Sequence, residues 1–104
     1  MEPPLQSMAR NIDESRQGRA FIFDTIAHGG FERRLNLSGI VNSSSKVFVS
    51  ISEIGIINGQ VKPFMGSASM EVHNVVPQDD GIVIVRGNVD WNNDLNVRLS
   101  VLVM

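Results

Sequence analysis

A chain of 104 residues with a net charge of −2, 19% charged residues and no cysteine predicts one small domain without disulfides. The lack of cysteine excludes thiolate metal sites and cysteine nucleophiles, and the mixed charge argues against nucleic acid, whose binders usually present a basic face. No apolar run is long enough to span a membrane, and the amino-terminal residues lack the apolar segment of a signal peptide. We therefore expect no nucleic acid partner, no membrane insertion, and a cytoplasmic or virion-associated protein rather than a classically secreted one.

Residues 1–17 show no sustained periodicity and predict a flexible amino-terminal arm. Residues 18–104 predict an all-β domain, because alternating apolar and polar residues recur between turn signals every 8–12 residues. The expected architecture is a six-stranded antiparallel β-sandwich, since a single small sheet would leave one apolar face in water. The expected strands are 19–27, 31–38, 46–52 with an extension toward the Asn58–Gly59 turn, 64–75, and the two arms of Gly81 to Met104.

The closing segment, Gly81 to Met104, carries the strongest pattern in the chain. Odd-numbered residues are apolar on the first arm, which ends at Trp91, and again on the second arm, residues 95–103. This alternation predicts that the odd-numbered face, Trp91 included, points into the core. A second set of apolar residues lies on the even face and predicts an oligomer interface: Ile82, Ile84, Leu102 and Met104. In a hairpin, Ile82 would lie opposite Met104 and Ile84 opposite Leu102; in an arch between two sheets, the patch would be split. Both arrangements remain open at this point.

Catalytic and metal chemistry find little support in the sequence. The chain has two histidines, His28 beside a Gly-Gly pair and His73 within a predicted strand, and no local signature places a nucleophile beside either. Two isolated histidines without cysteine make a poor zinc site, and Asp79-Asp80-Gly81 is typical of a turn rather than of a calcium loop. The adjacent pair Arg33–Arg34 is expected to be solvated at strand ends. We expect no enzymatic activity, no metal and no cofactor.

The bend at residues 91–94 gathers an aromatic ring with amide and carboxylate side chains. Asn92, Asn93 and Asp94 offer donors and acceptors that match vicinal hydroxyls, and the face of Trp91 could pack on the C–H side of a sugar. In the alternative interpretation, Trp91 belongs to the core and the polar residues merely tolerate turn geometry. The residues alone do not decide between these interpretations.

Three stretches in this order resemble the H-type lectins, the snail-agglutinin-like domains also found at the end of discoidin-type lectins. The first is Phe31 to Ile51, which resembles that family's second strand, turn and third strand, with VFVSISEIGI near the family's usual apolar, serine-containing strand. The others are Met70 to Gly81 (MEVHNVVPQDDG) and Trp91-Asn92-Asn93-Asp94 before an apolar last strand. The likeness covers about residues 18–104. It implies a six-stranded antiparallel sandwich, assembled as a trimer, that binds N-acetylgalactosamine-type sugars at subunit boundaries. It also implies that the last two strands lie in different sheets.

The resemblance also implies a set of sugar-binding residues. Asn92 occupies the position after the motif tryptophan, Glu71 falls where the family has a strand arginine, and Asp24 is the nearest candidate for a loop aspartate. Together with the bend, the predicted carbohydrate-binding residues are Asp24, Glu71, Trp91, Asn92 and Asp94. Glu71 reverses the charge of the family's arginine. The leading hypothesis is a trimeric, non-enzymatic lectin-like module; the alternative is a structural or assembly domain, of the phage tail or appendage type, that keeps the sandwich without binding sugar.

Overall fold

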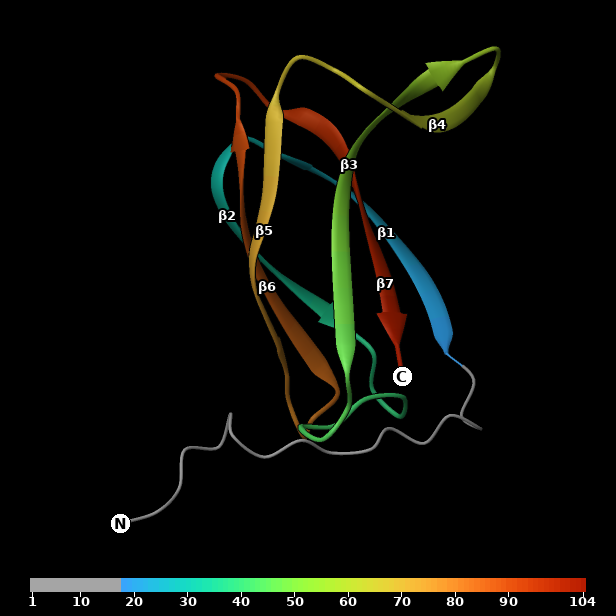
Figure 1. The fold of residues 1–104 in the computed structure, drawn as a ribbon, viewed down its shortest axis with the longest axis vertical. Coiled ribbons are helices and arrows are strands. Elements are labelled where there is room, and N and C mark those ends of the chain that lie inside the picture. Colours follow the sequence, from blue (N-terminus) through green and yellow to red (C-terminus); the bar gives the residue numbers. More distant parts are fainter. Residues whose placement is uncertain (1–17) are drawn as a thin grey trace, which may run out of the picture.

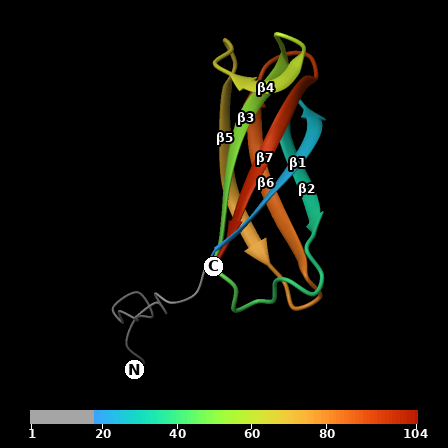
Figure 2. The same cartoon turned by 90° about the vertical axis from the view of Figure 1, so that its right-hand side faces the viewer.

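The computed structural model describes residues 18–104, which form seven strands in two antiparallel sheets; the predicted arm, residues 1–17, lies outside the described residues. The described part contains no helix, and hence none long and apolar enough to cross a membrane. One sheet has the strand order β1-β7-β3-β4 and the other β2-β6-β5 (Figures 1 and 2). The strands are β1 (Arg19–Ala27), β2 (Gly29–Asn36), β3 (Val47–Ile57), β4 (Gln60–Phe64), β5 (Ser69–Pro77), β6 (Ile82–Asp90) and β7 (Leu95–Val103).

The two closing strands are the central strands of different sheets. β6 pairs with β2 and β5, whereas β7 pairs with β1 and β3, so the bend between them arches from one sheet to the other. The arch implied by the resemblance is therefore confirmed, and the hairpin alternative is wrong. Ile82 does not lie opposite Met104, because Ile82 pairs with Asn36. The four-residue interface patch of the hairpin is accordingly divided between the two sheets.

The structure has one strand more than the sequence predicts. Asn58 and Gly59 both have positive φ, 53° and 77°, as a two-residue type I′ hairpin turn requires. The turn signal was therefore correct, but residues 60–64 return along β3 as β4, with Ile57 opposite Gln60 and Glu53 opposite Phe64. The sequence does not predict this strand, because Lys62 and Pro63 are disfavoured within sheets and are tolerated mainly on edge strands such as β4. The predicted strand 64–75 accordingly begins later, at Ser69.

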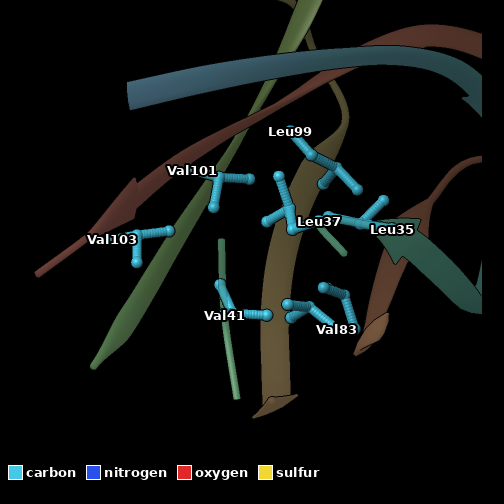
Figure 3. Close-up of a cluster of buried hydrophobic side chains, with 8 residues drawn as sticks. Leu35, Leu37, Val41, Val83, Leu99, Val101 and Val103 are labelled. Atoms are coloured by element: carbon cyan, nitrogen blue, oxygen red, sulfur yellow. The ribbon is translucent and has the colours of Figure 1, made fainter. Parts of the chain in front are cut away.

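The two sheets pack around a shared core, which makes the fold sandwich-like. As predicted, the odd-numbered residues of β6 and β7 point inward, and Val83, Val85, Val97 and Leu99 are fully buried. Figure 3 shows side chains from both sheets meeting in the main cluster, which contains Leu35, Leu37, Val41, Val83, Val85, Leu99, Val101 and Val103. Burying each such side chain contributes roughly 1.5–3 kcal/mol. A second, smaller cluster of Ala27, Phe31, Val89 and Val97 lies toward the arch.

Candidate carbohydrate-binding site

The arch, residues 91–94, carries an exposed tryptophan. The Trp91 amide donates to the Val89 carbonyl at 2.8 Å, which turns the chain out of β6 before the ring can enter the core. Trp91 is 44% exposed and belongs to neither core cluster. Its expected place on the inward face is therefore wrong, as is the core interpretation. Trp91, Asn92 and Asp94 are all exposed at one end of the molecule, the upper end in Figure 1.

A histidine ties the arch to the neighbouring corner. The chain passes from β1 to β2 through His28 and Gly29, whose φ of +62° suits glycine. His28 Nδ1 lies 2.5 Å from Asp94 Oδ1, and both side chains are about half exposed. Asp94 is therefore engaged within the chain, and its carboxylate is only partly available to a ligand.

Asp24 lies on the outer face of the four-stranded sheet. It is directly opposite Arg98 of β7, whose Nε and Nη2 donate to the two Asp24 carboxylate oxygens at 2.8 and 3.1 Å. These hydrogen bonds lower the pKa of Asp24 below its usual value and raise that of Arg98. A bidentate arginine–carboxylate pair of this kind fixes both side chains, and each oxygen of the Asp24 carboxylate already accepts a hydrogen bond.

Glu71 lies on the other sheet. It is opposite Asn88 of β6, and both belong to the outward-facing register, because the next pair along, Val72 and Gly87, faces inward. His73 Nε2 is 2.9 Å from Glu71 Oε2, and a register shift between Val72 and Asn74 accompanies this pair. Asp24 and Glu71 thus extend from opposite outer faces of the sandwich. A ligand the size of one sugar cannot contact both within one chain.

β3 and β5 belong to different sheets and lie side by side (Figures 1 and 2). Residues of both strands line a cleft of about 540 Å³. Glu71 lines it and is the only predicted sugar-site residue that does, among the residues that the structure describes. The connection from β4 to β5, residues 65–68, contributes to its lining. The lining consists of Ile51, Ser52, Glu53, Phe64, Met65, Gly66, Ser67, Ala68, Ser69, Met70 and Glu71.

Glu53 is the main residue that sequence reasoning missed. Its carboxylate lies against Gly66, and a Cβ atom at residue 66 would require the end of the Glu53 side chain to move. The strand predicted over residues 64–75 includes the small residues Gly66-Ser67-Ala68, but in the structure these residues belong to the connection between β4 and β5. Ser69 lines the cleft and pairs with Asp90, the residue before Trp91, so this part of the lining lies next to the arch.

The predicted interface residues have different surroundings. Ile84 lines a hollow of about 370 Å³ on the three-stranded sheet together with charged residues, among them Glu32, Arg34 and Arg86. Leu102, on the other sheet, lies beside Phe48 in a more apolar hollow of about 330 Å³. Ile82 and Met104 are half-buried. The two sets cannot form one continuous patch, because they belong to opposite sheets.

Arg33 differs from its predicted role as a solvated residue. Its guanidinium donates to the backbone carbonyls of Glu32 and Ile26 at 2.9 and 2.6 Å, and it lies 5.6 Å from the centre of the Phe31 ring. These contacts use donors that a phosphate site would need. Arg34 does remain exposed beside Glu32.

Comparison with known proteins adds no relative: no family model, no curated protein and no solved structure matches this chain.

Proposed function

We propose that this protein is a non-enzymatic module that binds carbohydrate in the cleft between β3 and β5. The observation that supports this proposal is the position of Glu71. The resemblance assigns this residue to a sugar site, and the same residue lines the cleft. Each histidine has a carboxylate as its partner, Asp94 for His28 and Glu71 for His73, and within residues 18–104 neither forms a hydrogen bond to a serine or threonine hydroxyl that could act as a nucleophile.

The chemistry of the lining suits a neutral polyhydroxylated ligand. Among the residues that line the cleft, Glu53 and Glu71 carry carboxylates that accept hydrogen bonds, and Ser52, Ser67 and Ser69 carry hydroxyls that both donate and accept. One oxygen of the Glu71 carboxylate is also in contact with His73. Phe64, Met65 and Met70 supply apolar surface for the C–H face of a ring. Two carboxylates without a lysine or arginine in the lining disfavour acidic sugars. A sugar with hydroxyl and N–H donors, such as N-acetylgalactosamine, fits this arrangement.

A single shallow site of this kind binds weakly, and affinity then comes from several linked sites. The resemblance implies three copies in an assembly, which would supply that multivalency. The exposed Trp91 lies one residue beyond the Ser69–Asp90 pair, and this position supports our proposal that its ring contacts a second sugar unit of a longer glycan.

The test is a titration of the full-length protein with N-acetylgalactosamine, followed by amide chemical shifts in two-dimensional NMR. We expect the shifts to move at residues 66–71 and at Glu53. Glu71→Gln and Glu53→Gln should each weaken binding by roughly tenfold or more, because each removes a charged hydrogen-bond acceptor. Glu32→Gln is the matched control: it removes the same charge from an exposed residue that pairs with Arg86 and lies outside the cleft. Equal affinities for all three variants would contradict the proposed site.

A second candidate function is that of an assembly domain without sugar binding. The observation that favours it is the apolar surface on the four-stranded sheet and on the β3–β4 hairpin. The exposed side chains there include Ile22, Phe48, Ile56, Val61, Met65 and Leu102. A glycan array separates the two functions: no bound glycan, with an intact oligomer and an unchanged profile for Trp91→Ala, would favour the assembly domain.

A further inference from the structure

Among residues 18–104, β1 is the edge strand with the fewest features that oppose pairing: its charged residues are Arg19, at its first position, and Asp24, which pairs with Arg98. Natural edges are blunted by lysine, proline, bulges or short length. The other three edges show such features: β4 is five residues long with Lys62 and Pro63, β5 has a register shift and Pro77, and β2 begins with two glycines and holds two arginines. β1 runs for nine residues in unbroken register with β7 and contains neither proline nor lysine.

The backbone groups that β1 presents at its free edge follow from the ladder. Lys46 and Met104 exchange two backbone hydrogen bonds, so the even-numbered residues of β7 bond to β3. The odd-numbered residues of β7 therefore bond to β1, and their partners in β1 are also odd-numbered. The N–H and C=O groups of the even residues consequently point away from the sheet. These residues are Ala20, Ile22, Asp24 and Ile26.

Arg33 covers one end of this edge. Its Nη2 donates to the Ile26 carbonyl at 2.6 Å, and its Nε lies 3.4 Å from the Thr25 hydroxyl. The backbone carbonyl of Ile26 therefore already accepts a hydrogen bond within the chain. Among residues 18–104, no backbone or side-chain donor reaches the outward carbonyls of Ala20, Ile22 and Asp24. These three residues form the open segment of β1.

The surface beside the open segment is apolar. Ile22 is 60% exposed. Ala20 pairs with Leu102, and Leu102 pairs with Phe48, so these three residues form one row across β1, β7 and β3. Ala20, Ile22, Phe48 and Leu102 all line the hollow of about 330 Å³ on this face. A strand that paired with β1 would therefore also cover exposed apolar side chains.

The geometry points to a second copy of this chain as the occupant, paired antiparallel through β1 about Ile22. In this two-fold register Ile22 lies opposite Ile22 of the second copy, and Ala20 lies opposite Asp24 of the second copy. Each pair exchanges two backbone hydrogen bonds, and two apolar residues meet at the axis. A register centred on Asp24 would place two carboxylates opposite each other and would need the carbonyl of Ile26, which Arg33 occupies.

The open segment is thus self-complementary, as an isologous contact requires. The pairing joins two four-stranded sheets into one continuous sheet. β1 and β4 are opposite edges of that sheet, so the cleft between β3 and β5 stays accessible. The assembly then contains an even number of chains, including the case in which trimers join in pairs.

The experiment measures the mass of the full-length protein by light scattering across a micromolar concentration series. We expect an even number of chains, and we expect Ile22→Pro to halve the mass, because proline removes the N–H at the centre of the pairing. Ile26→Pro is the matched control: it makes the same change on the same edge, outside the paired segment, and should leave the mass unchanged. Ile22→Lys, which places two like charges at the axis, should also halve the mass and serves if the proline variant does not fold.

Amide hydrogen exchange gives a second readout. The amides of Ala20, Ile22 and Asp24 should be protected at high protein concentration and should exchange rapidly on dilution. A monomer throughout the series, an odd-numbered assembly, or a mass unaffected by both Ile22 variants would overturn the inference. Protection that does not depend on concentration would also overturn it, because the edge would then be covered within one chain. Sugar binding to the cleft is measured separately, so its loss would reject the proposed function without affecting this inference.

Discussion

Arg98 of β7 and Asp24 of β1 face each other across the outer surface of the four-stranded sheet and share two hydrogen bonds, at 2.8 and 3.1 Å. The pair lies between two apolar positions of β1, Ile22 and Ile26, which are exposed on the same face. It therefore interrupts the apolar surface of this sheet and limits the apolar row to the end that carries Phe48 and Leu102.

The pair predicts a contribution to stability that depends on pH. Because the pKa of Asp24 in the folded protein is lowered from 3.8, the unfolded chain binds this proton more strongly. The stabilisation is present above the unfolded pKa and is lost as the pH falls through the folded pKa. Asp24→Asn should make the free energy of unfolding less dependent on pH below about 4 and should lower it by less than about 1 kcal/mol at pH 7, since the Asp24 side chain is 43% exposed. Urea unfolding at pH 7 and pH 3 measures both effects; an unchanged pH dependence would contradict this role.

Leu99 and Leu102, both in β7, predict opposite responses to the same substitution. Leu99 is fully buried in the shared core, whereas Leu102 is 41% exposed on the outer face. Leu99→Ala should lower the free energy of unfolding by about 3–5 kcal/mol, because it leaves a cavity. Leu102→Ala should lower it by less than about 1 kcal/mol in the monomer. Urea denaturation at low protein concentration separates the two variants, and similar losses would show that the face assignment is wrong.

Trp91 predicts a small effect on stability for so large a side chain. A buried tryptophan typically costs about 3–5 kcal/mol when replaced by alanine. Because Trp91 is exposed at the arch, Trp91→Ala should cost less than about 1 kcal/mol. Trp91 is the only tryptophan and the chain has no tyrosine, so fluorescence quenching by acrylamide reports on the arch directly. Inaccessible fluorescence together with a large loss of stability would place the ring in the core.

Gly81 and Gly39 predict different costs for a glycine-to-alanine change at positive φ. Gly81 has a φ of +86°, donates to Gln78 and accepts from Leu37, and a Cβ atom there would clash with the backbone of Ser38. Gly39 has a φ of +79° with open space around it. Gly39→Ala should cost about 1 kcal/mol from strain alone, and Gly81→Ala should cost more than that because the backbone must also move. Thermal unfolding of the two variants compares the costs, and equal values would exclude the steric contribution.

The sequence predicted the fold class and the inward faces of most strands, because alternation depends only on which residues prefer water. It failed where local preference and context disagree. β4 contains Lys62 and Pro63 and does not look like a strand, yet the Asn58–Gly59 turn returns the chain beside β3. Trp91 continues the odd apolar pattern, but the hydrogen bond from its amide to Val89 ends the strand and leaves the ring outside.

The candidate site was only partly predictable. Glu71 is among the residues that the sequence predicts for the site and it lines the cleft, whereas Glu53 is not predicted, because residues 53 and 71 come together only through the β3–β4 hairpin and the loop that follows it. Asp24 was grouped with Glu71, whereas the sheet topology places the two on opposite faces. Spacing along a chain does not specify which of two sheets a strand joins.

The closing segment shows most clearly what each level determines. By itself, the sequence determined that the odd-numbered face of residues 83–89 and 95–103 is buried. Alternation with period two places all of these apolar side chains on one face of a strand, and that face is stable only when it is removed from water. Only the tertiary structure decided that the two arms lie in different sheets, since the same alternation serves a hairpin and an arch equally well. That choice separates Leu102 from Ile84 and exposes Trp91, because strand partners are set by packing between distant segments rather than by local pattern.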